Sequence, residues 1–395
     1  MPRGRSPMGI IFLTIFLDLV GFGIVLPLLP RFAAEYQAEK WQIGLLMATY
    51  SLMQFFLSPV WGRLSDRIGR RPVLLISIAG SAISYALFAF AGSLPMLFVA
   101  RIVAGGMAAN IGTAQAYIAD ITTPENRARG MGMVGAAFGL GFVFGPALAG
   151  LLSHYALENG WRPQLVVGLA ATLFSVLDLV LAAARLPESL TPELRARATA
   201  PTSGRLARMQ AALRSPALGL PIIVLFLSTA GWSALEPTLG LLSRDRFNLN
   251  EAQTGYLFAY LGVIVAFVQG GLTGRMARRS GETRMAMVGA LLLTIALALI
   301  PSVQHWGPLL GLLALLAVGQ AMLLPGVQSL ISRAASRDEQ GTTLGASQGF
   351  SSLARVVGPA AGGVLYGMGQ NMPLWFSAGL LGVTFLLTTR LRPPE

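Results

Sequence analysis

Long apolar stretches recur along the whole chain, each bounded by charged residues or by proline and glycine. A helix that crosses a bilayer needs about 20 mostly apolar residues, and twelve stretches meet that length. Backbone polar groups in lipid must bond within their own segment, which favours helices. The predicted spans cover residues 8–30, 41–60, 72–91, 95–119, 129–153, 161–185, 217–243, 251–273, 284–302, 306–333, 341–368 and 372–391.

Composition agrees with this pattern. Hydrophobic residues make up 54% of the 395 residues and charged residues only 12%, whereas a soluble domain carries about 25% charged residues. The chain therefore has too much apolar surface to bury in one water-soluble core. We predict an all-α polytopic membrane protein, with the lipid bilayer as its surroundings.

The net charge of +12 does not indicate a nucleic-acid partner, because of where the charges lie. Most of the 29 lysines and arginines fall on alternate connections that share one side with the N-terminus. This is the positive-inside pattern, and it predicts that both termini are cytoplasmic. The first apolar run is too long for a cleaved signal peptide and is predicted to be a retained span.

Residues able to hold a metal are scarce. The chain has no cysteine and two histidines, His154 and His305, which excludes disulfides and thiolate chemistry. We therefore expect no metal site and no cofactor. A membrane enzyme would need a cluster of histidines, cysteines or acids at a membrane face, and none is visible, so we expect no enzymatic activity.

Two halves of the chain repeat each other. The basic loop 62–71 has a weaker copy at 274–281, and the glycine-proline segment 145–150 matches 358–363 at nearly the same offset along the chain. Such repeats predict two pseudo-symmetric six-helix bundles, residues 1–186 and 217–395. The connection 187–216 is predicted to be a cytoplasmic linker, either a tether alone or one with a short amphipathic helix around 206–213.

Ionisable residues inside predicted spans are candidates for transport chemistry, since each costs about 2.5–3.5 kcal/mol at a helix centre on insertion scales. Asp18, Arg101 and Glu236 are the principal candidates for proton coupling, with Asp18 as carrier and Arg101 tuning it. The alternative is a static ion pair for the first two, and an outward-facing side chain for Glu236. Asp178 and Arg355 are further ionisable residues in spans.

Several motifs carry a resemblance to a known family. The loop Gly62-Arg-Leu-Ser-Asp66-Arg-Ile-Gly69-Arg70-Arg71 resembles the signature between helices 2 and 3 of the major facilitator superfamily. The stretch 18–30 resembles the first-helix signature of its twelve-helix drug:proton antiporter branch, and 135–150 resembles the antiporter signature of helix 5. The passage 116–129 is similar to helices 4 and 5 of the tetracycline-efflux group. The resemblance covers the whole chain and implies that fold.

The resemblance also implies roles for two groups of residues. A conformational latch between the halves would comprise Gly62, Asp66, Gly69, Arg70 and Asp120, with Arg70 paired to Asp120 and Asp66 facing the helix end near 341–343. The antiporter helix, packed tightly against the opposite half, would depend on Gly141, Gly145, Pro146 and Gly150. The alternatives are a solvated basic loop and ordinary helix packing.

Polar and aromatic side chains in the spans are candidates for substrate binding, because drug-sized ligands bind in mostly apolar pockets with few polar groups. Gln115 and Gln328 recur at the same offset as the glycine-proline segments and are expected to face each other. The other candidates are Asn110, Tyr50, Gln54, Gln269, Trp232, Phe138 and Phe258, although for any one aromatic residue contact with lipid or packing is the favoured alternative.

These features predict a proton-coupled antiporter that exports small amphipathic drugs by alternating access, a monomer in a prokaryotic inner membrane. An exporter of sugar, metabolite or lipid, or an uncoupled facilitator, is the alternative within the same fold. Tetracycline-specific efflux is a further alternative. Tetracycline exporters carry carboxylates in helices 3 and 9, where this chain has Ile83-Ser-Tyr85 and Leu291-Leu-Leu293.

Overall fold

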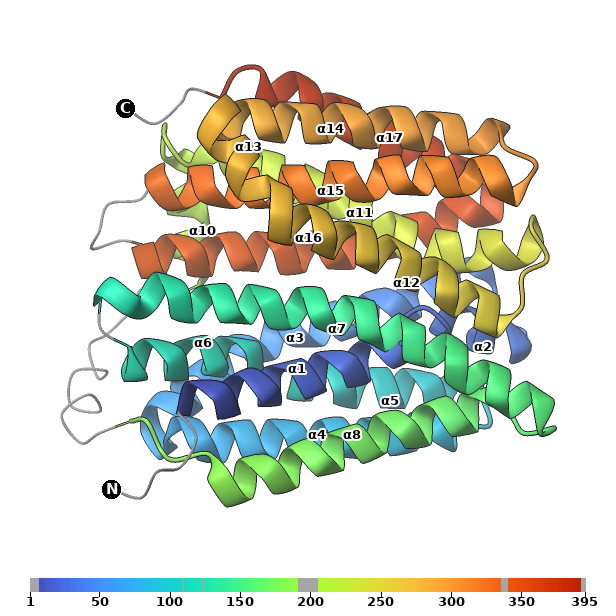
Figure 1. Ribbon diagram of the computed structural model, residues 1–395, viewed down its shortest axis with the longest axis horizontal. Helices are drawn as coiled ribbons and strands as arrows, with labels where there is room; N and C mark the ends of the chain where they lie inside the picture. Colours follow the sequence, from blue (N-terminus) through green and yellow to red (C-terminus); the bar gives the residue numbers. More distant parts are fainter. Residues whose placement is uncertain (1–6, 109, 123, 191–204, 335–339, 392–395) are drawn as a thin grey trace. The chain divides into compact units, whose positions relative to one another are not determined.

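The computed structural model describes residues 7–108, 110–122, 124–190, 205–334 and 340–391. Every regular element in these ranges is a helix, as the apolar runs predict. The helices of the first half of the chain are α1 (Pro7–Val25), α2 (Leu29–Glu35), α3 (Lys40–Ile68), α4 (Arg70–Ala89), α5 (Leu94–Met107), α6 (Asn110–Ile121), α7 (Pro124–Glu158) and α8 (Pro163–Arg185). Long helices lie side by side, for example α1 with α7 and α4 with α8 (Figure 1).

The second half begins with a short helix and continues with long ones. Its elements are α10 (Arg205–Arg214), α11 (Gly219–Asp245), α12 (Glu251–Phe267), the π-helical turn η1 (Val268–Leu272), α13 (Thr273–Ser280), α14 (Glu282–Leu299), the 3₁₀ turn η2 (Ile300–Ser302), α15 (Trp306–Ala334), α16 (Gln340–Met368) and α17 (Met372–Thr388). Of the two alternatives for the linker, the structure shows the one with a short helix, α10, around residues 206–213. Residues 191–204 of the expected linker lie outside the described residues.

Ten helical segments among the described residues are long and apolar enough to cross a bilayer. They coincide with ten of the twelve predicted spans. The two remaining predictions fall on α16, which is outside that set, and on α17, a shorter apolar helix of 17 residues. The chain is thus a helical membrane protein, and the count of twelve spans stays a prediction.

By its internal contacts the chain divides into two compact units. Unit 1 comprises residues 1–37, 53–202 and 251–259, and unit 2 comprises 38–52, 203–250 and 260–395. The division follows the two predicted halves except in two places. The beginning of α3 packs within unit 2, and the beginning of α12 packs within unit 1.

Both units contain close helix pairs built on small residues, and two of these pairs match each other. In unit 1, α7 packs on α1, and a Cβ added at Gly145 would stand 2.6 Å from the Cα of Gly23. In unit 2, α16 packs on α11, and a Cβ at Gly358 would meet the carbonyl oxygen of Ala230 at 2.5 Å. Since Gly145 and Gly358 begin the two matching glycine-proline segments, the sequence repeat corresponds to a repeated contact.

The beginnings of α3 and α12, which belong to the unit of the other half of the chain, both make close glycine contacts there. In unit 1, a Cβ at Gly255 of α12 would stand 2.7 Å from the Cα of Gly150. In unit 2, a Cβ at Gly363 would stand 2.7 Å from the Cα of Gly44 of α3. Small residues permit such close backbone approach in membranes.

An ion pair accompanies each of these contacts. Arg31 pairs with Glu251 in unit 1, and Lys40 Nζ lies 2.9 Å from Asp245 Oδ2 in unit 2. Asp245 follows Arg31, and Glu251 follows Lys40, at nearly the offset that separates the repeated motifs. The two pairs therefore occupy repeat-related places with their charges exchanged.

Candidate functional site

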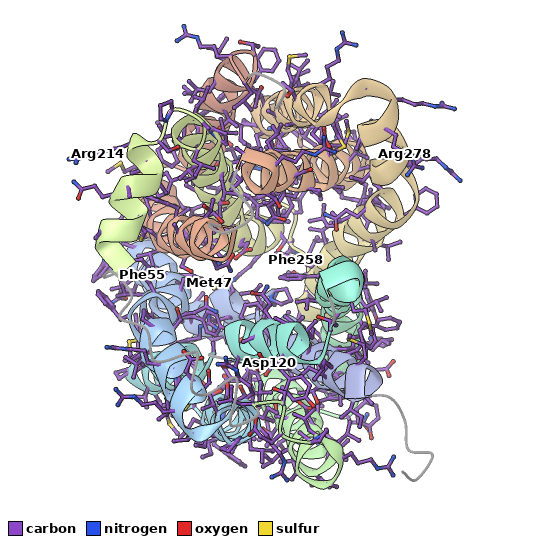
Figure 2. The ribbon with its side chains drawn as sticks, turned by 90° about the vertical axis from the view of Figure 1, so that its left-hand side faces the viewer. Met47, Phe55, Asp120, Arg214, Phe258 and Arg278 are labelled. Carbon is purple, nitrogen blue, oxygen red and sulfur yellow. The ribbon has the colours of Figure 1, made fainter. Side chains whose placement is uncertain are left out.

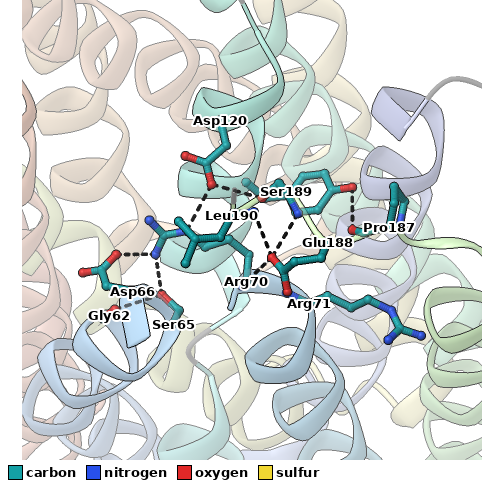
Figure 3. Close-up of polar contacts among 11 residues, drawn as sticks. Gly62, Ser65, Asp66, Arg70, Arg71, Asp120, Pro187, Glu188, Ser189 and Leu190 are labelled. Carbon is teal, nitrogen blue, oxygen red and sulfur yellow. Dashed lines mark hydrogen bonds and ion pairs between the residues drawn. The ribbon is translucent and has the colours of Figure 1, made fainter. Parts of the chain in front are cut away.

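A polar cluster surrounds Arg70 at the beginning of α4, and we call it the Arg70 cluster. Its members are Ser65, Asp66, Arg70, Asp120, Glu188 and Ser189, drawn in Figure 3. The Arg70 side chain is 10% exposed, with Nη1 at 2.5 Å from Asp66 Oδ1 and Nε at 3.2 Å from Asp120 Oδ2. Asp120 lies near the end of α6 that faces the viewer in Figure 2. The predicted Arg70–Asp120 pair is confirmed.

Two serines extend the cluster. Arg70 Nη1 donates to Ser65 Oγ at 2.7 Å, and Ser65 Oγ donates to the carbonyl oxygen of Gly62 at 2.8 Å. Ser189 Oγ donates to Asp120 Oδ2 at 3.0 Å. Arg70 is therefore paired with two carboxylates, and its donors are held in a fixed orientation. The expected approach of Asp66 to residues 341–343 would join the two units and stays a prediction.

Glu188, just beyond α8, caps the beginning of α4. Its carboxylate accepts the backbone N–H of Arg70 at 2.9 Å and of Arg71 at 3.2 Å, and also those of Ser189 and Leu190, both at 3.0 Å. The first N–H groups of a helix have no partner within it and favour negative charge.

Gly69, the residue before α4, has φ 113°, and a Cβ there would collide with the Glu188 carboxylate. Glycine adopts such left-handed conformations without strain. The absence of a side chain at Gly69 therefore leaves room for the Glu188 carboxylate at the beginning of α4. Gly69 thus has a structural role besides its place in the predicted latch.

The second half contains a counterpart of this cluster with reversed charges. Gly281 has φ 78° before α14, and Glu282 Oε1 lies 2.7 Å from Arg333 Nη2 at the end of α15. Glu282 stands at the repeat-related place of Arg70, and Arg333 at that of Asp120. The later copy therefore keeps an interhelical ion pair. Arg278, which replaces Asp66, is exposed and points away from α13 (Figure 2).

The ionisable residues of the spans in unit 1 lie on three helices. Asp18 is half-buried on α1 and accepts a hydrogen bond from Ser81 Oγ of α4 at 3.4 Å. Arg101 on α5 is 5% exposed. Asp178 on α8 is fully buried. Charged side chains inside membrane spans cost free energy and are usually retained for a function. The interior of unit 1 that holds these three residues is therefore a candidate functional site.

Glu236 belongs to a different group, in unit 2. Glu236 is half-buried on α11. It lies close enough to Arg355 of α16 for its charge to act on the guanidinium, and Tyr50 of α3 is also close to that guanidinium. Arg355 is also half-buried, and its Nη2 donates to Ser352 Oγ at 3.5 Å. Glu236 thus belongs to a different unit from Asp18 and Arg101, and the predicted grouping of the three residues for proton coupling stays a prediction.

The predicted substrate-binding residues are divided between the units. Gln54, whose Nε2 donates to the Ala108 carbonyl at 3.4 Å, Gln115 and Phe258 belong to unit 1, whereas Tyr50, Trp232, Gln269 and Gln328 belong to unit 2. Gln115 and Gln328 are exposed within their own units. Their expected pairing would join the units and stays a prediction. The side chains of Asn110 and Phe138 lie outside the described residues.

The antiporter helix departs from one expectation. A Cβ at Gly141 would meet Leu19 of α1 at 2.6 Å, and Gly145 faces Gly23 of α1. Both glycines thus pack against their own half of the chain, because α1 and α7 share unit 1. Gly150 is the residue that contacts the other half of the sequence, through α12. Pro146 is buried inside α7.

Comparison with known proteins identifies the family. The sequence profile of the Major Facilitator Superfamily matches residues 11–300 and 270–395. The chain belongs to the Major Facilitator Superfamily. This superfamily member is 35% identical to the class C tetracycline resistance protein of Escherichia coli, over 90% of this chain and 89% of the relative.

Two further relatives cover nearly the whole chain. Major facilitator superfamily domain-containing protein 10 of Bos taurus is 32% identical over 98% of this chain and 93% of its own. The crystal structure of the human organic anion transporter MFSD10 (TETRAN) matches with a TM-score of 0.73 at 30% identity, covering 98% of this chain and 100% of that one. The protein is thus a tetracycline-efflux-like membrane transporter of small molecules. The expectation that it is no enzyme is confirmed, because these relatives are transporters.

Proposed function

We propose that this transporter exports small amphipathic molecules in exchange for protons, by alternating access of residues 1–186 against 217–395. The observation that carries the proposal is Asp18, a half-buried carboxylate inside α1 that accepts a hydrogen bond from Ser81. The similarity to tetracycline resistance proteins supports it. We further propose twelve spans, a monomer, a prokaryotic inner membrane and cytoplasmic termini.

Coupling follows from competition between proton and substrate. A buried carboxylate favours its neutral form, and an approaching cationic or polar group favours the ionised form. Protonation of Asp18 from outside would weaken substrate binding, and loss of the proton to the cytoplasm would restore it. The two ligands are then linked through the states of one protein.

The Arg70 cluster would govern the conformational change. Its pairs link the beginning of α4, the end of α6 and the chain after α8 within one unit. We propose that Asp66, whose side chain is 39% exposed, engages the residues near 341–343 in the outward-facing state. The electrostatic attraction of a carboxylate to a helix N-terminus is the physical basis.

A second candidate is transport of organic anions. The human relative of known structure is an organic anion transporter, and Arg355 provides a half-buried guanidinium in unit 2. Carboxylates bind guanidinium groups through paired hydrogen bonds. Because Glu236 acts on the same guanidinium, its protonation would favour anion binding. Proton and anion would then move in the same direction.

Reconstituted vesicles separate these candidates by the sign of the pH gradient. Purified protein in liposomes is tested with external ethidium, tetracycline or fluorescein, with the interior acidic or alkaline. Antiport predicts uptake of ethidium or tetracycline when the interior is acidic. Anion symport predicts uptake of fluorescein when the exterior is acidic. Protein-free liposomes correct for passive partitioning of weak acids and bases.

The result that overturns proton coupling is transport of a probe at the same rate under both gradients and without one. Asp18→Asn and Arg355→Gln assign the site. The first is expected to abolish gradient-driven uptake of ethidium or tetracycline, and the second to reduce fluorescein uptake selectively. Loss of all three probes in Arg355→Gln, with normal folding, would contradict a dedicated anion site.

A further inference from the structure

Asp178 is the most completely buried carboxylate described in the molecule. It lies on α8, is 0% exposed, and neither carboxylate oxygen has a hydrogen-bond partner among the described residues. Apolar side chains lie nearby: Ala182 of α8 belongs to a core cluster with Ile11 and Ile15 of α1, and Leu179 packs against this cluster. An ionised carboxylate in such a place is strongly disfavoured unless a cation pairs with it.

The cations near α8 are engaged elsewhere or distant along the helix. Arg71 of α4 donates from Nη2 to the carbonyl of Ala183 at 2.7 Å, and Arg185 is exposed at the end of α8. From α7, the titratable residues His154 and Glu158 pair with each other. They belong to the far end of that helix, close in sequence to the first residues of α8. Among the described side chains of α4 and α7, these contacts leave Asp178 without a compensating charge.

The polar neighbours of Asp178 come from α1 and from α8 itself. Asp18 is the charged group that acts on it, and Thr14, one turn earlier on α1, presents its hydroxyl. The Thr14 hydroxyl is itself buried and has no hydrogen-bond partner among the described residues, and the same holds for Ser175, one turn before Asp178 on α8. Two carboxyl groups and two buried hydroxyl groups therefore gather where α1 packs on α8.

We propose that Asp178 is a second proton-binding residue of the transport cycle, which exchanges one proton with Asp18. The proposal deepens the proton coupling suggested above and rests on it. Two neighbouring carboxylates resist simultaneous ionisation, so the pair retains one proton. When Asp18 loses its proton, the O–H bond at Asp18 breaks and a new one forms at a carboxylate oxygen of Asp178. Asp18 then carries the negative charge beside Ser81.

The position of Asp178 gives this transfer a direction. Thr14 lies nearer than Asp18 to the N-terminus of α1, and Asp178 lies about two turns before Arg185, the last residue of α8. On the predicted topology both of these ends are cytoplasmic. A proton that arrives at Asp18 and continues to Asp178 therefore moves inward, which is the direction that proton-driven export requires.

Infrared spectroscopy tests the proposal without a substrate. A protonated buried carboxyl group has a C=O stretch separate from that of carboxylates, and difference spectra over a pH series follow its loss. We expect a pH-dependent band with a component that disappears in Asp178→Asn, where only the contribution of Asp18 remains, and that shifts in Asp18→Asn. The absence of any pH-dependent band, or a pH series in Asp178→Asn that is identical to that of the wild type, overturns the proposal.

Transport assays distinguish this proposal from the broader one. The test applies once the wild-type protein has been shown to take up substrate in response to a pH gradient. Asp178→Asn is then expected to lower this gradient-driven uptake by about tenfold or more, while substrate exchange at equal pH changes little. Asp178→Leu serves as the second variant, because an apolar residue suits this environment. Normal gradient-driven uptake in either variant, with raised thermal stability, would contradict the proposal and show that Asp178 only destabilises the fold. Failure of the wild-type protein to couple would instead contradict the proposed function.

Discussion

At the scale of single residues, Arg70 and Glu188 illustrate how local chemistry fixes the beginning of a helix. Arg70 bonds two carboxylates and a serine through its side chain, while its own backbone N–H donates to Glu188. The Arg70–Asp120 pair was predictable from the family resemblance. Glu188 was not, because it is 118 residues away along the chain and exposed, and an acid directly after a predicted span was the only signal.

The cap predicts a measurable loss of stability in Glu188→Gln. Replacing the carboxylate weakens hydrogen bonds to four backbone N–H groups and removes the favourable interaction with the helix dipole. By analogy with other helix caps we expect about 0.5–2 kcal/mol of destabilisation, seen as a lower Tm of the detergent-solubilised protein. Glu158→Gln is the control, since Glu158 is also exposed but pairs with His154. Equal Tm changes in both variants would argue against a cap.

At the scale of helices, the repeat is clearest in contacts that sequence comparison does not reveal. The pair Glu282–Arg333 repeats Arg70–Asp120 with reversed charges, and Lys40–Asp245 repeats Arg31–Glu251 in the same way. Comparison of identical residues misses such relations, because Coulomb attraction depends on opposite signs and not on which helix carries which sign. The helices themselves were predictable from their apolar length.

Helix packing could be predicted only in part. The spacing of Gly141, Gly145 and Gly150 indicated a close contact, but it did not specify the partner helix. The family resemblance implied the opposite half, whereas Gly141 and Gly145 face α1. Glycine spacing reports how closely a backbone can be approached, and the partner is set by the fold as a whole.

This packing predicts different outcomes for two glycines of α7. A Cβ at Gly145 would stand 2.6 Å from the Cα of Gly23, whereas at Gly139 it would meet nothing within 4 Å. Gly145→Ala is expected to destabilise the protein by about 1–3 kcal/mol through overpacking. Gly139→Ala should leave stability unchanged or raise it by up to about 1 kcal/mol through helix propensity. Thermal unfolding in detergent compares the two, and equal stability would contradict the close contact.

At the scale of the whole molecule, a superfamily transporter with ionisable residues inside both units has the elements needed to couple two ligands. Asp18 and Asp178 lie in unit 1, whereas Glu236 and Arg355 lie in unit 2. The sequence identified all four as unusual, because charged residues inside apolar spans are rare. It grouped Asp18 with Glu236, which belong to different units, because the grouping depends on which helices pack together.

The most direct test of the account compares wild-type protein and Asp18→Asn in liposomes with an acidic interior. We predict that the wild type accumulates ethidium or tetracycline, that nigericin abolishes the accumulation by collapsing the gradient, and that Asp18→Asn does not accumulate the probe although it still exchanges it at equal pH. Accumulation by Asp18→Asn at the wild-type rate, or wild-type transport unaffected by nigericin, would contradict proton coupling through Asp18.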